Sequence, residues 1–284
     1  MRVSKKKVVS LAAAGLLAVS LVGCGSTPVD TYDLYDPDDP GTGSETAEEQ
    51  ATPGAKKSSA EVTQATFVDL VGASQESATT MHMETTYSGA AAEAAGITGV
   101  TMPTDVDVSD PESPRMSMSM NAEGTELSMI VVDGTYYLSM GELTEGKYIK
   151  ASLDEMMDDP MMGSFQSMSG SADPKAQLEG FGDAIVSFEA SGSDTVDGTD
   201  VDLYTLVLDP TKVTGPQIEQ LDPEMVEALG GMTVVYALDE TDRPLRVEVT
   251  MVIEGKSLVS TSVFSRWGED LDIEAPPADQ IFEQ

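Results

Sequence analysis

From residue 80 onward, most of the chain alternates apolar and polar residues in steps of two, which is typical of strands that bury one face. The pattern is clearest at 245–253, where Val247, Val249, Met251 and Ile253 share one parity and polar residues stand between them. The alternation predicts about ten strands, at 81–88, 116–121, 126–132, 135–140, 147–151, 185–191, 200–208, 233–238, 245–253 and 257–267. We therefore expect a large antiparallel sheet with one face against helices and the other in water.

Acidic residues followed by glycine mark the turns between these strands. Asp133-Gly134 lies between two apolar pairs and predicts the clearest hairpin, because Asp-Gly favours the two-residue turn that joins antiparallel strands. Further turns of this kind are expected at 123–124, 145–146, 197–198 and 254–255.

Helical patterns are few. A capping box at 58–61 precedes apolar residues at helical spacing and predicts a helix over 59–78. A second capping box at 152–155 and the pair Asp173-Pro174 predict short helices in an insertion at 152–182. Residues 90–114 are rich in Ala, Gly and Pro, and we expect a flexible flap there. The expected class is therefore α+β.

The N-terminus has the pattern of a secretory signal. Basic residues at positions 2 and 5–7 precede an apolar run over 8–22, too short for a comfortable membrane span. Leu21-Val22-Gly23-Cys24 resembles the bacterial lipobox, in which the Cys becomes the lipidated N-terminus. We expect 1–23 to be a lipoprotein signal peptide and Cys24 to carry acyl groups such as palmitate. The alternative is an ordinary cleaved signal with an incidental Cys.

The lipid anchor implies a cellular location for the protein. Residues 24–58 are rich in Asp, Pro, Gly, Ser and Thr and predict a disordered acidic tether, followed by a folded domain over 59–284. The expected location is the extracytoplasmic face of the cell membrane, with membrane contact through the lipid anchor.

Composition excludes several classes of protein. With 15 Lys+Arg against 50 Asp+Glu, the formal charge is −35, which argues against nucleic acid as a partner. The single Cys excludes an internal disulfide framework and a Cys-based zinc cluster, and the single His excludes a multi-His metal site. We predict no cofactor, and the sequence does not identify a protein partner.

The order of these elements carries a resemblance to a known family. The lipobox, acidic tether, single long helix and strand meander are followed by Trp267-Gly268 and by Ile273, Ala275, Pro276 and Pro277 near the end. Together they resemble actinobacterial lipoproteins of the LppX/LprG type, which are similar in fold to the LolA/LolB lipoprotein carriers. The resemblance implies a curved half-barrel sheet, covered by the N-terminal helix and short inserted helices, that holds the acyl chains of a lipid or glycolipid.

The 17 methionines are the main candidate binding chemistry. Flexible thioether side chains suit an adaptable apolar pocket, but they can equally fill a solid core, and soft sulfur ligands such as Met81-His82-Met83 can bind Cu(I). If the sheet is hollow, the candidate pocket residues are Met81, Met83, Met116, Met118, Met120, Met129, Val131, Val249, Met251 and Phe264.

Catalytic and metal-binding motifs are not apparent. The sequence has no G-x-S-x-G elbow, phosphate-binding glycine loop or EF-hand, and in a strand His82 points away from Met81 and Met83. The Asp-rich stretch 194–202 has the composition of a weak Ca²⁺ site, although a hairpin turn explains it as well. We predict no catalytic residue, no metal site and no enzymatic activity.

Two functions remain open. The first is a membrane-anchored carrier or chaperone that binds a lipid or glycolipid in an apolar hollow at the cell envelope. The second is a surface-displayed interaction or sensory module with a solid core and no ligand. A long apolar cavity would favour the first, and native packing density throughout would favour the second.

Overall fold

The computed structural model describes residues 62–110, 113–122, 125–152, 180–182, 184–214, 226 and 229–282. The predicted signal peptide, Cys24, the acidic tether and nearly all of the 152–182 insertion lie outside the described residues. So do the capping box predicted at 58–61 and the turn predicted at 123–124.

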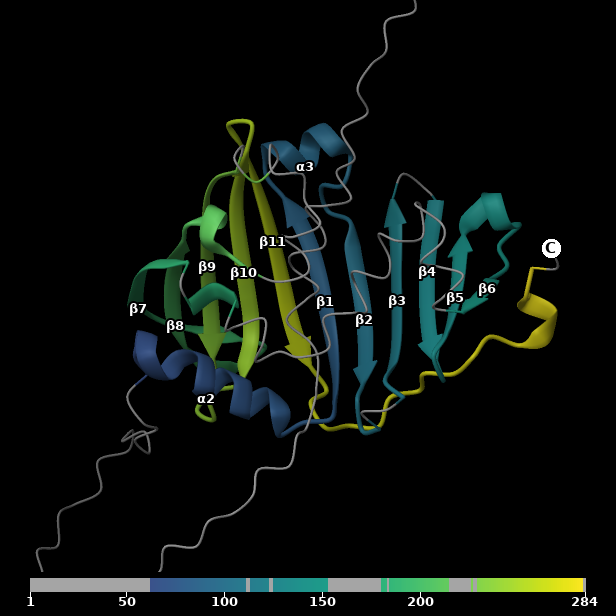
Figure 1. The fold of residues 1–284 in the computed structure, drawn as a ribbon, viewed down its shortest axis with the longest axis horizontal. Coiled ribbons are helices and arrows are strands. Elements are labelled where there is room, and N and C mark those ends of the chain that lie inside the picture. Colours follow the sequence, from purple (N-terminus) through teal and green to yellow (C-terminus); the bar gives the residue numbers. More distant parts are fainter. Residues whose placement is uncertain are drawn as a thin grey trace, which may run out of the picture.

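The described chain forms one antiparallel sheet of eleven strands in the order β6-β5-β4-β3-β2-β1-β11-β10-β9-β8-β7 (Figure 1). The strands are β1 (Thr80–Ser88), β2 (Thr101–Asp107), β3 (Arg115–Ala122), β4 (Thr125–Val132), β5 (Thr135–Met140), β6 (Ile149–Ser152), β7 (Ile185–Val196), β8 (Thr199–Leu208), β9 (Leu229–Leu238), β10 (Pro244–Ile253) and β11 (Lys256–Ser265). The expected α+β class and large antiparallel sheet are confirmed. The sheet is open, because β6 and β7 are its two edges and do not pair with each other.

Two consecutive meanders make up the sheet, and one long-range pairing joins them. Strands β1–β6 form the first meander and β7–β11 the second. The seam is the antiparallel pair β1–β11, in which Met83 lies opposite Phe264 and Thr85 opposite Ser262. The seam thus brings the beginning and the end of the domain together at the centre of the sheet.

The predicted acid–glycine turns are confirmed as two-residue hairpins at three positions, and Glu145–Gly146, which also have positive φ values, end the short 3₁₀ helix between β5 and β6. Asp133 and Gly134 have φ of 51° and 66°. In Asp197–Gly198 and Glu254–Gly255, φ is likewise positive at both residues. Two successive positive φ values define the turn whose twist matches that of the flanking strands. These turns set the registers of β4–β5, β7–β8 and β10–β11.

The long helix α2 (Gln64–Glu76) begins after Thr63 rather than at residue 59. The backbone N–H of Thr63 donates to Thr66 Oγ1 over 2.9 Å, which satisfies one group at the helix start. Phe67 and Val71 have no solvent exposure, and α2 crosses in front of β8–β10 in Figure 1. The helix therefore covers the half of the sheet that belongs to the second meander.

The prediction of a flexible flap over residues 90–114 is wrong. This stretch contains the short helix α3 (Ala90–Ala95) and strand β2, which lies between β1 and β3. Pro103 and two nearby acidic residues give it a turn-like composition. The pairing of β2 with β3 starts only at Thr104, so the proline stands where its missing N–H disturbs that ladder least.

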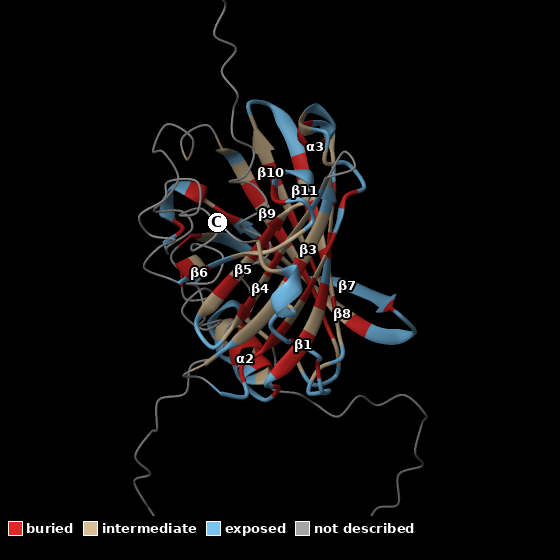
Figure 2. Cartoon of the chain, turned by 90° about the vertical axis from the view of Figure 1, so that its right-hand side faces the viewer, coloured by how far each residue is buried: buried red, intermediate tan, exposed pale blue. Residues whose placement is uncertain are grey.

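Most side chains buried in the sheet lie on one face, and a smaller cluster forms on the other. Val196 and Val201, near the tip of the β7–β8 hairpin, pack with Ala237, and Arg246 Nη2 donates to Asp194 Oδ2 over 2.7 Å. Figure 2 shows this hairpin projecting from the sheet, with buried positions repeating along the other strands. Two register shifts in the β7–β8 pairing accompany the bend of the hairpin.

After β11, which is a central strand, the chain runs along one end of the sheet to the edge formed by β6 (Figure 1). There the N–H of Tyr148 donates to the carbonyl of Gln280 over 2.8 Å, and the N–H of Phe282 donates to the carbonyl of Tyr148 over 2.7 Å. Tyr148 and Ile281 thus form a parallel bridge just before β6.

The turn from β1 into α3 offers a test of how closely that helix packs on β11. Gly89 has φ of +96°, and a Cβ there would lie 2.5 Å from the carbonyl oxygen of Ser257, whereas Gly99 (φ +73°) has open space around it. We expect Gly99→Ala to lower the free energy of unfolding by ~1–2 kcal/mol through backbone strain alone. Gly89→Ala should cost a further ~1–3 kcal/mol because backbone must shift. Urea unfolding measures both, and equal losses would contradict the close approach.

Candidate ligand-binding face

One face of the sheet, called the inner face here, collects the buried apolar residues. The registers connect them in rows across strands. Met81, Val106, Met116 and Val131 form one row. Phe264, Met83, Thr104, Met118 and Met129 form the next. The inner face is therefore continuous from β4 through the seam to the second meander.

All of the predicted pocket residues lie on the inner face. Rows of paired residues and the two-residue alternation place them there: Met81, Met83, Met116, Met118, Met120, Met129, Val131, Val249, Met251 and Phe264. Their role in binding a ligand stays a prediction.

Aromatic packing fills the half of the inner face under α2. The ring of Phe67 lies 4.9 Å from that of Tyr236 and 5.3 Å from that of Phe188, both edge-on, and Phe188 stacks on Tyr204 at 5.8 Å. Such contacts are worth ~0.5–1.5 kcal/mol beyond the area they bury. This half has the packing of a solid core.

The other half, over β1–β5, is lined mainly by methionines and is called the methionine half here. Met83, Met129 and Leu138 are 0–2% exposed, although α2 lies over the second meander (Figure 1). Inner-face positions in this half carry no charged side chain at 81–87, 102–106, 116–120 or 127–131. An uncharged, thioether-lined surface can repack around apolar groups of different shape.

Hydroxyl side chains interrupt the apolar inner face along the seam. They form a diagonal line across β2, β1 and β11, called the hydroxyl stripe here: Thr104, Thr85, Ser262 and Ser260. All four are 0–2% exposed. The hydroxyls of Thr85 and Ser262 share a hydrogen bond of 2.8 Å, whereas those of Thr104 and Ser260, and that of nearby Tyr236, have no hydrogen-bond partner among the described residues.

The site predicted from the sequence does not include the hydroxyl stripe. Thr85 and Thr104 have the same parity as Met83 and Met102, so a signal for these two exists in the alternation. On β11 the signal is ambiguous, because Val259 and Val263 alternate against Leu258 and Phe264. Only the pairing with β1 shows which parity is buried.

An aromatic cluster lies where β11 ends. Trp267 stacks on Phe264 at 5.8 Å, and the Arg243 guanidinium carbon lies 5.5 Å from the centre of the Trp267 ring. A guanidinium over an indole face is a favourable cation–π contact. The Trp267 of the predicted Trp-Gly motif therefore packs beside Phe264 at one end of the inner face.

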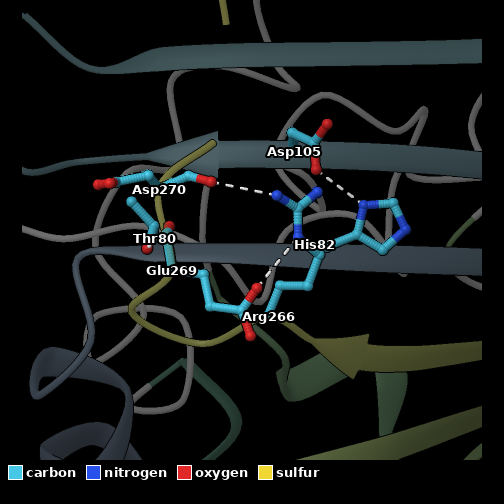
Figure 3. A network of polar contacts seen from close by, with 6 residues as sticks. All are labelled: Thr80, His82, Asp105, Arg266, Glu269 and Asp270. Atoms are coloured by element: carbon cyan, nitrogen blue, oxygen red, sulfur yellow. Dashed lines mark hydrogen bonds and ion pairs between the residues drawn. The ribbon is translucent and has the colours of Figure 1, made fainter. Parts of the chain in front are cut away.

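The single His lies on the opposite, outer face. His82 Nδ1 and Asp105 Oδ1 are 2.7 Å apart, and they are paired residues of β1 and β2. Figure 3 shows this pair beside Arg266, whose Nε donates to Glu269 Oε2 over 3.4 Å. The prediction that His82 points away from Met81 and Met83 is confirmed, so these three residues do not converge on one ion.

Among the described residues, no group of three His, Cys, Asp or Glu side chains is placed to hold a metal ion. The Asp-rich stretch 194–202 is the tip of the β7–β8 hairpin, and Asp194 there accepts from Arg246. Over the same part of the chain, no helix has both the length and the hydrophobicity to cross a membrane.

Several solved structures are similar to this chain, although no family model and no curated protein matches the sequence. LprF from Mycobacterium bovis is 12% identical with a TM-score of 0.48, over 75% of this chain and 96% of that one. The lipoprotein LppX of Mycobacterium tuberculosis is 16% identical with a TM-score of 0.47, over 74% and 98%. MucB in complex with MucA is 14% identical with a TM-score of 0.39, over 77% of this chain and 58% of that one.

The lipoprotein LppX, one of the proteins for which the family that the sequence resembles is named, is thus among the similar solved structures. Such low identities and TM-scores say nothing about function.

The buried phenol of Tyr236 offers a test of the inner face by pH. Its removal from water raises its pKa well above the ordinary 10.0, so the folded chain keeps it neutral while the unfolded chain ionises. Its contribution to stability is full below pH 10 and is lost as the pH rises, by ~1.4 kcal/mol per pH unit. We expect Tyr236→Phe to match the wild type in urea unfolding at pH 7 and to lose less stability between about pH 10 and about pH 11.5. Parallel losses would contradict a buried neutral phenol.

Proposed function

We propose that the protein is a membrane-anchored lipoprotein that binds the acyl chains of a lipid or glycolipid at the extracytoplasmic face of the envelope, as a carrier or chaperone. One observation carries the proposal. The methionine half of the inner face is uncharged and buried, and it is lined by side chains that can adapt to varied acyl chains. The aromatic half under α2 supplies the rigid support.

The electrostatics of the chain are consistent with this division of roles. A charge of −35 repels the domain from anionic headgroups, so membrane attachment depends on Cys24 and its acyl groups. The bound lipid then contacts the uncharged inner face. The chemistry is non-covalent and needs no cofactor.

The binding proposal predicts lipid in the purified protein. Expressed without residues 1–24 and extracted with organic solvent, the chain should release acyl lipid that mass spectrometry detects at a fixed ratio to protein. Met118→Trp should lower that ratio several-fold while the chain stays folded, because the indole occupies space on the inner face. Ser119→Trp, on the outer face of the same strand, is the matched control. A folded wild-type chain that repeatedly releases no lipid would contradict the proposal.

The anchoring proposal predicts a second, independent result. Cys24→Ser should move the full chain from the membrane fraction to the soluble fraction and abolish incorporation of labelled palmitate, because the acylated thiol is gone. Ser26→Ala should change neither readout. Persistence of Cys24→Ser in the membrane fraction with the label would refute anchoring at this residue.

A further inference from the structure

The hydroxyl stripe is unusual for a buried sheet surface. Ser260 and Thr104 are each 1% exposed, and Tyr236 is fully buried, yet none of their hydroxyls has a partner among the described residues. Buried hydroxyls are normally paired, because losing hydrogen bonds to water without replacing them is costly. Two of these groups, those of Thr104 and Ser260, lie on strands of the seam or directly beside it and therefore point to a polar partner that binds there.

The geometry limits the shape of that partner. Neighbouring strands lie ~4.8 Å apart and alternate residues ~6.6 Å apart, so the line from Thr104 to Ser260 spans roughly 16 Å. The hydrogen-bonded pair Thr85–Ser262 occupies its middle, which leaves the two ends for a ligand. A partner with several separated oxygens fits this spacing, whereas one polar atom does not reach both ends.

The charge of the surroundings limits the chemistry. The charged and titratable side chains at the seam, His82, Asp105 and Glu84, lie on the outer face. No inner-face position of the seam strands at 81–87 or 258–264, or of β10 at 247–251, carries a charge. A carboxylate or phosphate here would be buried without a counter-charge, which is strongly unfavourable. Neutral hydroxyl donors instead suit neutral acceptors such as ester carbonyl oxygens.

We infer that the hydroxyl stripe binds the ester carbonyls of a neutral, ester-linked acyl lipid, with the acyl chains on the adjoining methionine half. This inference rests on the proposed function and deepens it, because it assigns the part of the inner face that recognises the lipid's linkage. Thr104 and Ser260 are the specificity-determining donors. An acyl lipid with a charged linkage is excluded from the stripe.

The test uses two probes that differ only in the linkage, 1,2-dioleoylglycerol and its ether counterpart 1,2-di-O-oleylglycerol. Native mass spectrometry of the full chain, released from detergent micelles, measures the bound fraction of each. We expect the wild type to favour the ester. Thr104→Val with Ser260→Ala should weaken ester binding about fivefold, the effect of one lost hydrogen bond, because the neighbouring ester carbonyls of this probe reach only one end of the stripe at a time. Ether binding should be unchanged.

Two controls protect this test from a folding artefact. Both substitutions keep the side chain's approximate size and remove a hydroxyl without a partner, so thermal unfolding of the lipid-free variant should match or exceed the wild type. Thr250→Val with Ser265→Ala removes two hydroxyls from the outer face and should leave both affinities unchanged.

The outcomes separate this inference from the proposed function. If the wild type binds the ester and ether probes equally, or if the variant weakens binding of both alike, the stripe does not distinguish the two linkages. The inference is then wrong, although lipid binding itself is not contradicted. The inference falls in the same way if the variant changes neither affinity, as expected if the stripe holds ordered water only. If the wild type binds neither probe and releases no lipid on extraction, both proposals fall.

Discussion

The pairing of β1 with β11 is the constraint on which the rest of the structure depends. Each meander can set its own registers through short turns, but only this seam fixes the two meanders relative to each other. A slip of one residue would turn every side chain of one meander to the opposite face. The methionines would then face away from Phe264 and Val249, and the inner face would no longer be continuous. The Thr85–Ser262 hydrogen bond lies on this seam and is satisfied only in the observed register.

The two halves of the inner face solve different physical problems. Under α2, aromatic rings hold fixed edge-on and stacked contacts, which give one well-defined packing. On the methionine half the side chains are flexible and uncharged, so they tolerate several packings at similar energy. A rigid half beside an adaptable half lets the sheet keep its shape while what lies against the methionines varies. The seam and its hydroxyls mark the boundary between the two.

Much of this architecture follows from the sequence because it depends on local patterns. The alternation predicts ten of the eleven strands, and Asp133-Gly134 predicts a hairpin at the place where two positive φ values occur. Strand β2 is not predicted by the alternation, because Pro103, Thr104 and Asp105 lower the apolar signal of its sequence. It forms a strand because it pairs with β1 on one side and β3 on the other. The hydroxyl stripe depends on which residues meet across a seam between distant segments. No local pattern contains that information.

The chain's last residues have a consequence for how the sheet meets other molecules. An edge strand exposes unpaired N–H and C=O groups that can pair with a strand of another chain. Next to β6, both backbone groups of Tyr148 are already bonded to the segment around Ile281. The segment around Ile281 thus occupies, at Tyr148, the place that an incoming strand would take. A strand that extends the sheet along this edge through Tyr148 would first have to displace that segment.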